Sequence, residues 1–230
     1  MTDLPFKALT FDCFGTLVDW RKGQQEALGN LPALADVSLD FVAVDAARLR
    51  VEVRLLARAW RPYAEILAES ILAAVREVHG VVLSRGQCLQ FAHSQARWPA
   101  FPDSVAALGA LATRYRLALL SNCDAEMLAA SATQTLALEN PLLVSSELVR
   151  SYKPRHRHWE AALGALHCQP QEVLHVSAYA YYDLIPALEL GLKIAWVKRD
   201  NEQQPEGLPL AFVATDLVDL AKQMLSPSAR

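Results

Sequence analysis

Short apolar runs alternate with segments of helical periodicity along most of the chain. The apolar runs have almost no polar residue inside them, which is typical of parallel strands that are covered on both faces. They predict strands at residues 7–12, 116–121, 142–146, 173–177 and 193–197. Helical spacing between these runs predicts helices at residues 104–114, 125–134, 158–166 and 184–190. This alternation indicates an α/β fold, a Rossmann-like doubly wound parallel sheet.

Residues 19–97 interrupt the alternation. Two long amphipathic patterns predict helices at 44–60 and 63–79, and no strand is evident there. Turn-forming prolines at 99 and 102 mark the return to the α/β pattern. We therefore expect residues 1–18 and 98–230 to form a discontinuous core domain, with residues 19–97 inserted as a helical cap that hinges near Asp19 and Trp98. The alternative is a helical layer fixed to the core.

Composition and charge exclude several classes of protein. Of the 230 residues, 53% are hydrophobic and 20% are charged, with a net charge of −3, as in globular proteins without a basic surface for nucleic acid. No apolar run is long enough to span a membrane, and the first strand begins too early to leave room for a signal peptide. The four cysteines are far apart and are expected to be reduced thiols in a cytoplasmic protein. Apolar residues of the 44–60 helix are compatible with a homodimer.

The first strand ends in the most informative residue of the chain. Asp12 follows an apolar strand and precedes Phe14, Gly15 and Thr16. A carboxylate at such a strand end can attack an electrophile covalently. Three other polar groups follow predicted strands or precede a helix: Ser121-Asn122, Lys153-Pro154, and Ser177 with Asp183. Parallel strands bring their carboxyl ends to one edge of a sheet, so these groups are expected to converge.

The order and spacing of these four pieces resemble the motifs of the haloacid dehalogenase superfamily over nearly the whole chain. The chain looks closest to the L-2-haloacid dehalogenase branch, in which an aromatic residue stands two positions after the nucleophile, as Phe14 does here. Phosphatases of the superfamily have aspartate there. The resemblance implies a Rossmann-like core, a mobile or semi-fixed cap and a covalent intermediate on Asp12.

The resemblance assigns a role to each candidate residue. Asp12 would attack the carbon that bears the halogen, and the charge of Lys153 would keep Asp12 ionised. Asp183 would orient or deprotonate the water that hydrolyses the ester, although it could instead cap the following helix. Ser177 would steady Lys153 or that water. Candidate substrate-binding residues are Phe14, Thr16, Ser121, Asn122 and, for the substrate carboxylate, Arg48 or Arg21.

Two departures from the dehalogenase pattern concern the hydrolytic water. Trp159 stands six residues after the lysine, where the family has a tyrosine. Ala178, Tyr179 and Ala180 replace a polar pair, and the spacing from Ser177 to Asp183 is one residue longer. His156 and His158 have no other metal ligands nearby in the sequence, and we expect them to be solvated at a helix start.

Three functions remain open at this point. The sequence favours hydrolytic dehalogenation of small 2-haloalkanoic acids without a metal or other cofactor, because a halide leaves without a proton. Phe14 cannot protonate a leaving alkoxide, and Ala178 offers no metal ligand. The alternatives are a Mg²⁺-dependent phosphatase acting on a small phosphate ester and a protein that kept the fold and lost turnover.

Overall fold

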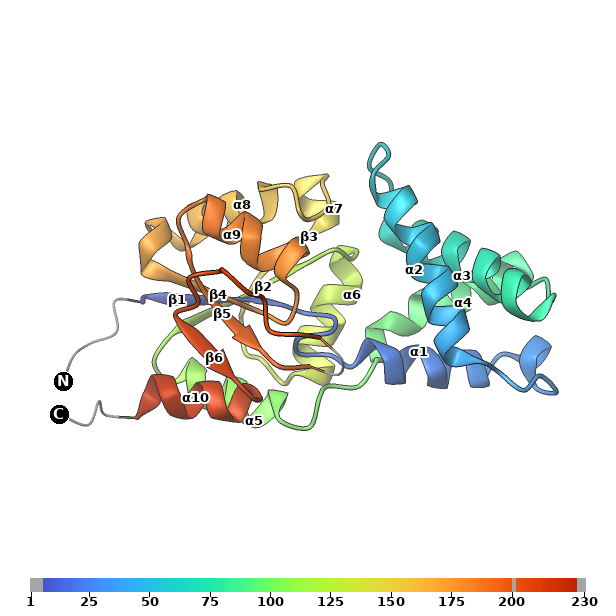
Figure 1. Ribbon diagram of the computed structural model, residues 1–230, viewed down its shortest axis with the longest axis horizontal. Coiled ribbons are helices and arrows are strands. Elements are labelled where there is room, and N and C mark those ends of the chain that lie inside the picture. Colours follow the sequence, from blue (N-terminus) through green and yellow to red (C-terminus); the bar gives the residue numbers. More distant parts are fainter. Residues whose placement is uncertain (1–5, 200–201, 227–230) are drawn as a thin grey trace.

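A single parallel sheet organises the core of the protein in the computed structural model, which describes residues 6–199 and 202–226. The strand order in this six-stranded sheet is β3-β2-β1-β4-β5-β6, which confirms the predicted doubly wound α/β class (Figure 1). The strands are β1 Ala8–Asp12, β2 Arg116–Ser121, β3 Leu142–Ser145, β4 Val173–Ser177, β5 Lys193–Val197 and β6 Phe212–Ala214.

Two hydrophobic clusters cover the two faces of the sheet, because successive side chains of a strand point to opposite faces. Leu9 and Phe11 of β1 belong to the larger cluster, and Ala8 belongs to the smaller one. Helices α5 and α10 lie on one face and α8 and α9 on the other (Figure 1). The helices of the core are α5 Ser104–Ala112, α6 Ala125–Ala130, α7 Ser146–Val149, α8 Arg157–Leu166, α9 Ile185–Glu189 and α10 Leu217–Leu225.

Residues between β1 and α5 form a separate group of helices beside the sheet (Figure 1). They are α1 Trp20–Gly29, α2 Phe41–Leu56, α3 Tyr63–His79 and α4 Arg85–Ser94. Short 3₁₀ turns lie at Pro32–Leu34, Gln95–Arg97 and Pro170–Glu172, and π-helical turns lie at Ser131–Thr135 and Ala180–Leu184. We call residues 19–97 the helical segment.

The two chain crossings into the helical segment run side by side. The Asp19 N–H donates to the Pro99 carbonyl at 2.8 Å, and the Phe101 N–H donates to the Leu17 carbonyl at 3.0 Å. Gly23 of α1 packs against the Trp98 side chain so closely that a Cβ there would lie 2.2 Å from the indole Cγ. Both crossings are therefore held in register near the residues expected to act as hinges.

A second contact, away from the two chain crossings, joins the helical segment to the core through the N-terminus of α3. The Asp124 carboxylate, from the loop after β2, accepts from the Tyr63 and Ala64 N–H groups, both at 2.8 Å. Asp124 also precedes α6, yet the Ala125 N–H of α6 donates to Glu147 at 2.9 Å. A core carboxylate thus caps a helix of the inserted segment, while Glu147 caps the core helix.

Replacing Asp124 with alanine is expected to loosen this docking. Loss of a cap costs about 1–2 kcal/mol, which should speed hydrogen exchange at the Tyr63 and Ala64 amides about five- to thirtyfold. Exchange measured by mass spectrometry over the α3 N-terminus checks this. Glu147→Ala is the matched control, because it removes the cap of α6 and should leave α3 exchange unchanged. Equal exchange in the Asp124→Ala variant and the wild type would refute the docking role.

Among the described residues, no helix is long and apolar enough to cross a membrane. The cysteines at 13, 88, 123 and 168 are buried and free of disulfides, as expected for reduced thiols.

Candidate active site

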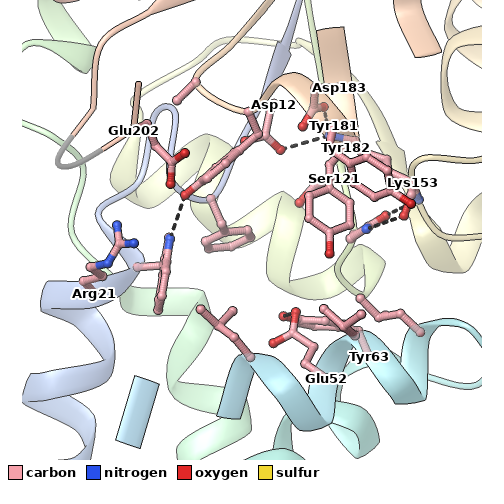
Figure 2. Close-up of a pocket in the computed structure, with 18 of the residues that line it drawn as sticks. Asp12, Arg21, Glu52, Tyr63, Ser121, Lys153, Tyr181, Tyr182, Asp183 and Glu202 are labelled. Carbon is pink, nitrogen blue, oxygen red and sulfur yellow. Dashed lines mark hydrogen bonds and ion pairs between the residues drawn. The ribbon is translucent and has the colours of Figure 1, made fainter. Parts of the chain in front are cut away.

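The strand ends bring the candidate residues to one edge of the sheet. Asp12 lies opposite Leu120 in the register of β1 and β2, so Ser121 follows immediately beside it. Ser177 ends β4, the other neighbour of β1. Asp12, Ser121 and Asp183 face a cavity across from Glu52 and Tyr63 of the helical segment (Figure 2).

The loop after β1 fixes the Asp12 carboxylate from one side. Gly15 has a φ of 93°, and a Cβ there would lie 2.1 Å from the Tyr179 hydroxyl oxygen, so only glycine fits. The turn places the Thr16 hydroxyl where it donates to Asp12 Oδ2 at 2.8 Å. The same hydroxyl oxygen accepts from the Ala178 N–H at 3.2 Å, which fixes its direction.

Lys153 joins the two candidate carboxylates. Its Nζ donates to Asp12 Oδ1 at 2.9 Å and to Asp183 Oδ1 at 2.7 Å. Asn122 holds the lysine backbone: the Lys153 N–H donates to Asn122 Oδ1 at 2.7 Å, and the Asn122 amide donates to the Lys153 carbonyl at 3.3 Å. Asn122 therefore positions Lys153 as well as lining the cavity.

The charges of this trio are set by burial and by each other. Burial raises the pKa of Asp12 to about 6, with Lys153 opposing the shift and Asp183 adding to it. Burial also acts to raise the pKa of Asp183, but Lys153 and His175 outweigh it and hold this pKa below its ordinary value. Burial would lower the pKa of Lys153, but the two carboxylates raise it. Near neutral pH the site holds an ammonium between two carboxylates.

A π-helical turn presents Asp183 to Lys153. The Leu184 N–H donates to the Tyr179 carbonyl at 3.2 Å, five residues earlier in the chain. A π turn accommodates one residue more than an α turn, so it takes up the longer spacing from Ser177 to Asp183. The Asp183 side chain faces Lys153 and does not cap α9, which settles the alternative of a simple helix cap.

Ser177 and Tyr179 support the loop that follows β1. The Ser177 hydroxyl lies 3.4 Å from the Thr16 hydroxyl and accepts from the Tyr179 N–H at 3.0 Å. Among the described residues, Ser177 forms no hydrogen bond with Lys153, whose ammonium donates to Asp12 and Asp183. The Trp20 indole N–H donates to the Tyr179 hydroxyl at 3.1 Å and so ties the helical segment to the fourth motif.

A cavity of about 580 Å³ lies between the sheet edge and the helical segment. Arg48 lines it, is 3% exposed, forms an ion pair with Glu52 and lies 5.0 Å from the Trp20 ring centre. Arg21 also lines it and lies 4.6 Å from the same ring. Among the arginines of the α2 region, Arg50 and Arg61 pair with glutamates of α3 and do not line the cavity.

Arg199 is a residue of the site that is not evident from the sequence. It donates to the Thr16 carbonyl at 2.9 Å and to Asp103 at 2.8 Å. It therefore holds the loop after β1 through the Thr16 backbone. Arg199 is not part of any motif. It lies after β5, more than 180 residues along the chain from Thr16.

Two histidines lie closer to the site than their sequence context indicates. The expectation for His158 was wrong: it is fully buried, and its Nε2 lies 3.1 Å from the Ser121 carbonyl, as a donor. Its spacing of four and eight residues from Ala162 and Leu166, which are also buried, is the signal that places it on the inner face of α8. His175, inside an apolar strand, is also buried beside Asp183.

Comparison with known proteins identifies the family. The family model for haloacid dehalogenase-like hydrolases matches residues 6–188, which is most of the chain. The chain belongs to the haloacid dehalogenase-like hydrolases. This confirms the resemblance carried by the four motifs, and it identifies the chain as a hydrolase.

Curated relatives in this hydrolase family cover nearly the full length. The chain is 26% identical over 204 residues to (S)-2-haloacid dehalogenase 1 of Pseudomonas sp. (strain CBS-3), which covers 87% of this chain and 88% of the relative. It is 27% identical over 218 residues to (S)-2-haloacid dehalogenase 4A of Burkholderia cepacia, covering 93% of each. Among solved structures, the L-2-haloacid dehalogenase PA0810 matches with a TM-score of 0.83 and 28% identity, over 95% of this chain and 98% of that one.

The donor set of this hydrolase does not suit a magnesium ion. The ammonium of Lys153 already lies between Asp12 and Asp183, and Phe14 and Ala178 offer no oxygen side chain. Within the described part of the chain, no group of three or more histidine, cysteine, aspartate or glutamate side chains is arranged to hold a metal ion.

Proposed function

We propose that this hydrolase cleaves the carbon–halogen bond of small 2-haloalkanoic acids through a covalent ester on Asp12, without a metal. The observation that supports this most is the Lys153–Asp12 pair beside Phe14. It provides an ionised nucleophile, with phenylalanine at the position where a carboxylic acid would protonate a leaving group. The relatives named as 2-haloacid dehalogenases support the same reaction class.

In the first step, an Asp12 carboxylate oxygen attacks C2 of the substrate, and the halide leaves with the bonding electron pair. Displacement inverts C2 and leaves an ester between Asp12 and the substrate. Thr16 and Lys153 hold the attacking carboxylate at 2.8 Å and 2.9 Å, so little orientation has to be achieved during the reaction. The anionic substrate is bound near Arg48 or Arg21, where a guanidinium can form a bidentate ion pair with its carboxylate.

In the second step, a water molecule gives a proton to Asp183 and adds to the ester carbonyl carbon of Asp12. The tetrahedral intermediate expels the alkoxide of the 2-hydroxy acid, which takes the proton from Asp183. Asp12 then loses its remaining proton to solvent and is restored. Asp183 suits this role because it lines the cavity and its low pKa keeps it ionised before water arrives.

A direct assay separates the three candidate functions. Purified protein is incubated with 2-chloropropionate, 2-chlorobutyrate and p-nitrophenyl phosphate, each with excess EDTA or with Mg²⁺, and chloride and phosphate are measured. The proposal expects chloride release that EDTA does not change. Phosphate release that requires Mg²⁺ would favour the phosphatase, and no product from any substrate would favour a protein without turnover.

The pH dependence of dehalogenation is expected to follow Asp12. Because only the ionised carboxylate attacks, kcat/KM should be constant above neutral pH. It should fall about tenfold per pH unit below the raised pKa of about 6. Initial rates with 2-chloropropionate from pH 4.5 to 8.5 measure this. An acid limb near the ordinary aspartate value would mean that burial does not govern the nucleophile.

We further propose that residues 19–97 act as the cap over the site, that the protein is cytoplasmic and that its partner is a small-molecule substrate. Val42, Leu49 and Val53 of α2 are exposed apolar residues, of which Leu49 and Val53 also line the cavity, and we propose on this basis a homodimer through the cap. Size-exclusion chromatography with light scattering tests this, and a monomer at assay concentrations would refute it.

A further inference from the structure

A buried histidine lies directly behind the carboxylate assigned to the hydrolytic step. His175 is the third residue of β4 and is fully buried. Its Nε2 is 3.2 Å from Asp183 Oδ1, and its Nδ1 is 2.8 Å from the Thr10 hydroxyl of the neighbouring strand. The Trp159 ring packs edge-on against the imidazole, with ring centres 5.4 Å apart.

The partners of His175 define its tautomer. Asp183 is ionised beside Lys153, so it can only accept a hydrogen bond. A neutral imidazole has one N–H, which must therefore be on Nε2 and point at Asp183. Nδ1 then accepts from the Thr10 hydroxyl. Burial lowers the pKa of His175, in keeping with a neutral ring.

Both donors to Asp183 end on the same oxygen. Lys153 Nζ and His175 Nε2 lie 2.7 Å and 3.2 Å from Oδ1, and no hydrogen bond from the described residues ends on Oδ2. The arrangement fixes the carboxylate and leaves Oδ2 to accept from another group. Trp159 cannot accept a proton or a hydrogen bond from the attacking water, because an indole has no acceptor. Its Nε1 has no hydrogen-bond partner among the described residues.

The ester intermediate makes the second donor important. When Asp12 becomes a neutral ester, Lys153 loses one of its two anionic partners and can shift. The bond from His175 does not depend on Asp12, because β4 and Thr10 hold the ring. We propose that His175 is a positioning residue for ester hydrolysis, with its Nε2–H holding Asp183 Oδ1 so that Oδ2 takes the proton of the attacking water. This rests on the proposed dehalogenation.

The test compares His175→Phe with His175→Gln. Phenylalanine keeps a ring of similar size without a donor, whereas the glutamine amide can place an N–H near the position of Nε2. Rapid-quench measurement of chloride from 2-chloropropionate, together with intact-protein mass spectrometry, separates the two steps.

His175→Phe is expected to release the first chloride at a rate within about threefold of the wild type. Steady-state turnover should fall about ten- to hundredfold, with the ester adduct accumulating on the protein. His175→Gln should recover most of the turnover. Wild-type turnover in His175→Phe, or equal losses in the chloride burst and the steady state, would overturn the proposal.

Thr10→Val provides an independent variant if His175→Phe does not fold. Valine has the shape of threonine but cannot donate to Nδ1, so the Nδ1–H tautomer becomes accessible and the donor to Asp183 is weakened. The same selective slowing of hydrolysis is expected at about three- to tenfold, and its absence counts against His175. A wild-type protein that releases no chloride at all would instead overturn the proposed function, and this inference with it.

Discussion

Replacing Asp12 with asparagine is expected to reduce chloride release from 2-chloropropionate by about 10⁴-fold or more. The amide has almost the shape of the carboxylate, but it lacks the negative charge that attacks carbon. The amide oxygen can still accept from Lys153, and the burial of a charge is removed, so the melting temperature should change little. Steady-state chloride release and thermal unfolding of the same preparation provide the measurement.

Asp183→Asn is the matched control, because it removes the second carboxylate of the same trio. This variant should still release one chloride per active site and retain the ester adduct, whereas Asp12→Asn should form no adduct. Intact-protein mass spectrometry distinguishes the two. Residual turnover of Asp12→Asn within about tenfold of the wild type would rule out covalent attack by Asp12.

The strands were largely predictable because each is buried on both faces and so has a continuous apolar sequence. β2, β4 and β5 occur at the predicted residues. β6 was missed, since it has only three residues, of which Phe212 is half-buried, Val213 exposed and Ala214 buried, and this gives too short a pattern. α10 was also missed, although its buried residues Leu217, Leu220 and Met224 have helical spacing.

The helical segment was predicted only in part. α3 was predicted at its observed bounds, because its apolar face is regular. The buried face of α1 includes Gly23 and Gln24, which are not strongly apolar, and that of α4 is limited to Cys88, Phe91 and Ala92. α4 begins with a capping box of Ser84 and Gln87, whose spacing is visible in the sequence, whereas the packing of its Phe91 against Trp98 becomes evident only once the chain is folded.

The meeting of Asp12, Lys153 and Asp183 could be predicted, because the topology of a parallel sheet brings its strand ends together. The finer chemistry of the site could not. His175 lies in an apolar strand, where sequence periodicity says only that it is buried. The ion pair of Arg48 with Glu52 changes how an arginine is presented to a substrate, and it depends on the rotation of α2 over the cavity.

Lys153 determines the electrostatic stability of this site, because it is the cation that lies between two buried carboxylates. Its side chain is 2% exposed, and those of Asp12 and Asp183 are 10% and 2% exposed. Removing one partner of a buried ion pair leaves an uncompensated charge and costs about 3–5 kcal/mol. The remaining carboxylates would repel each other, so the pKa of at least one of them must rise.

Lys153→Met is therefore expected to lower the free energy of unfolding by about 3–5 kcal/mol at pH 7 and to abolish turnover. In the variant, the pKa of one carboxylic acid is higher in the folded state than in the unfolded state, so its ionisation destabilises the fold. The loss of stability relative to the wild type should therefore become smaller as pH falls toward 5, where protonation of this acid removes one negative charge. Urea unfolding of both proteins at pH 7 and pH 5 measures this. The double variant Asp12→Asn with Lys153→Met should regain part of the lost stability at pH 7. A Lys153→Met protein as stable as the wild type at both pH values would mean that water, and not the ammonium, compensates these carboxylates.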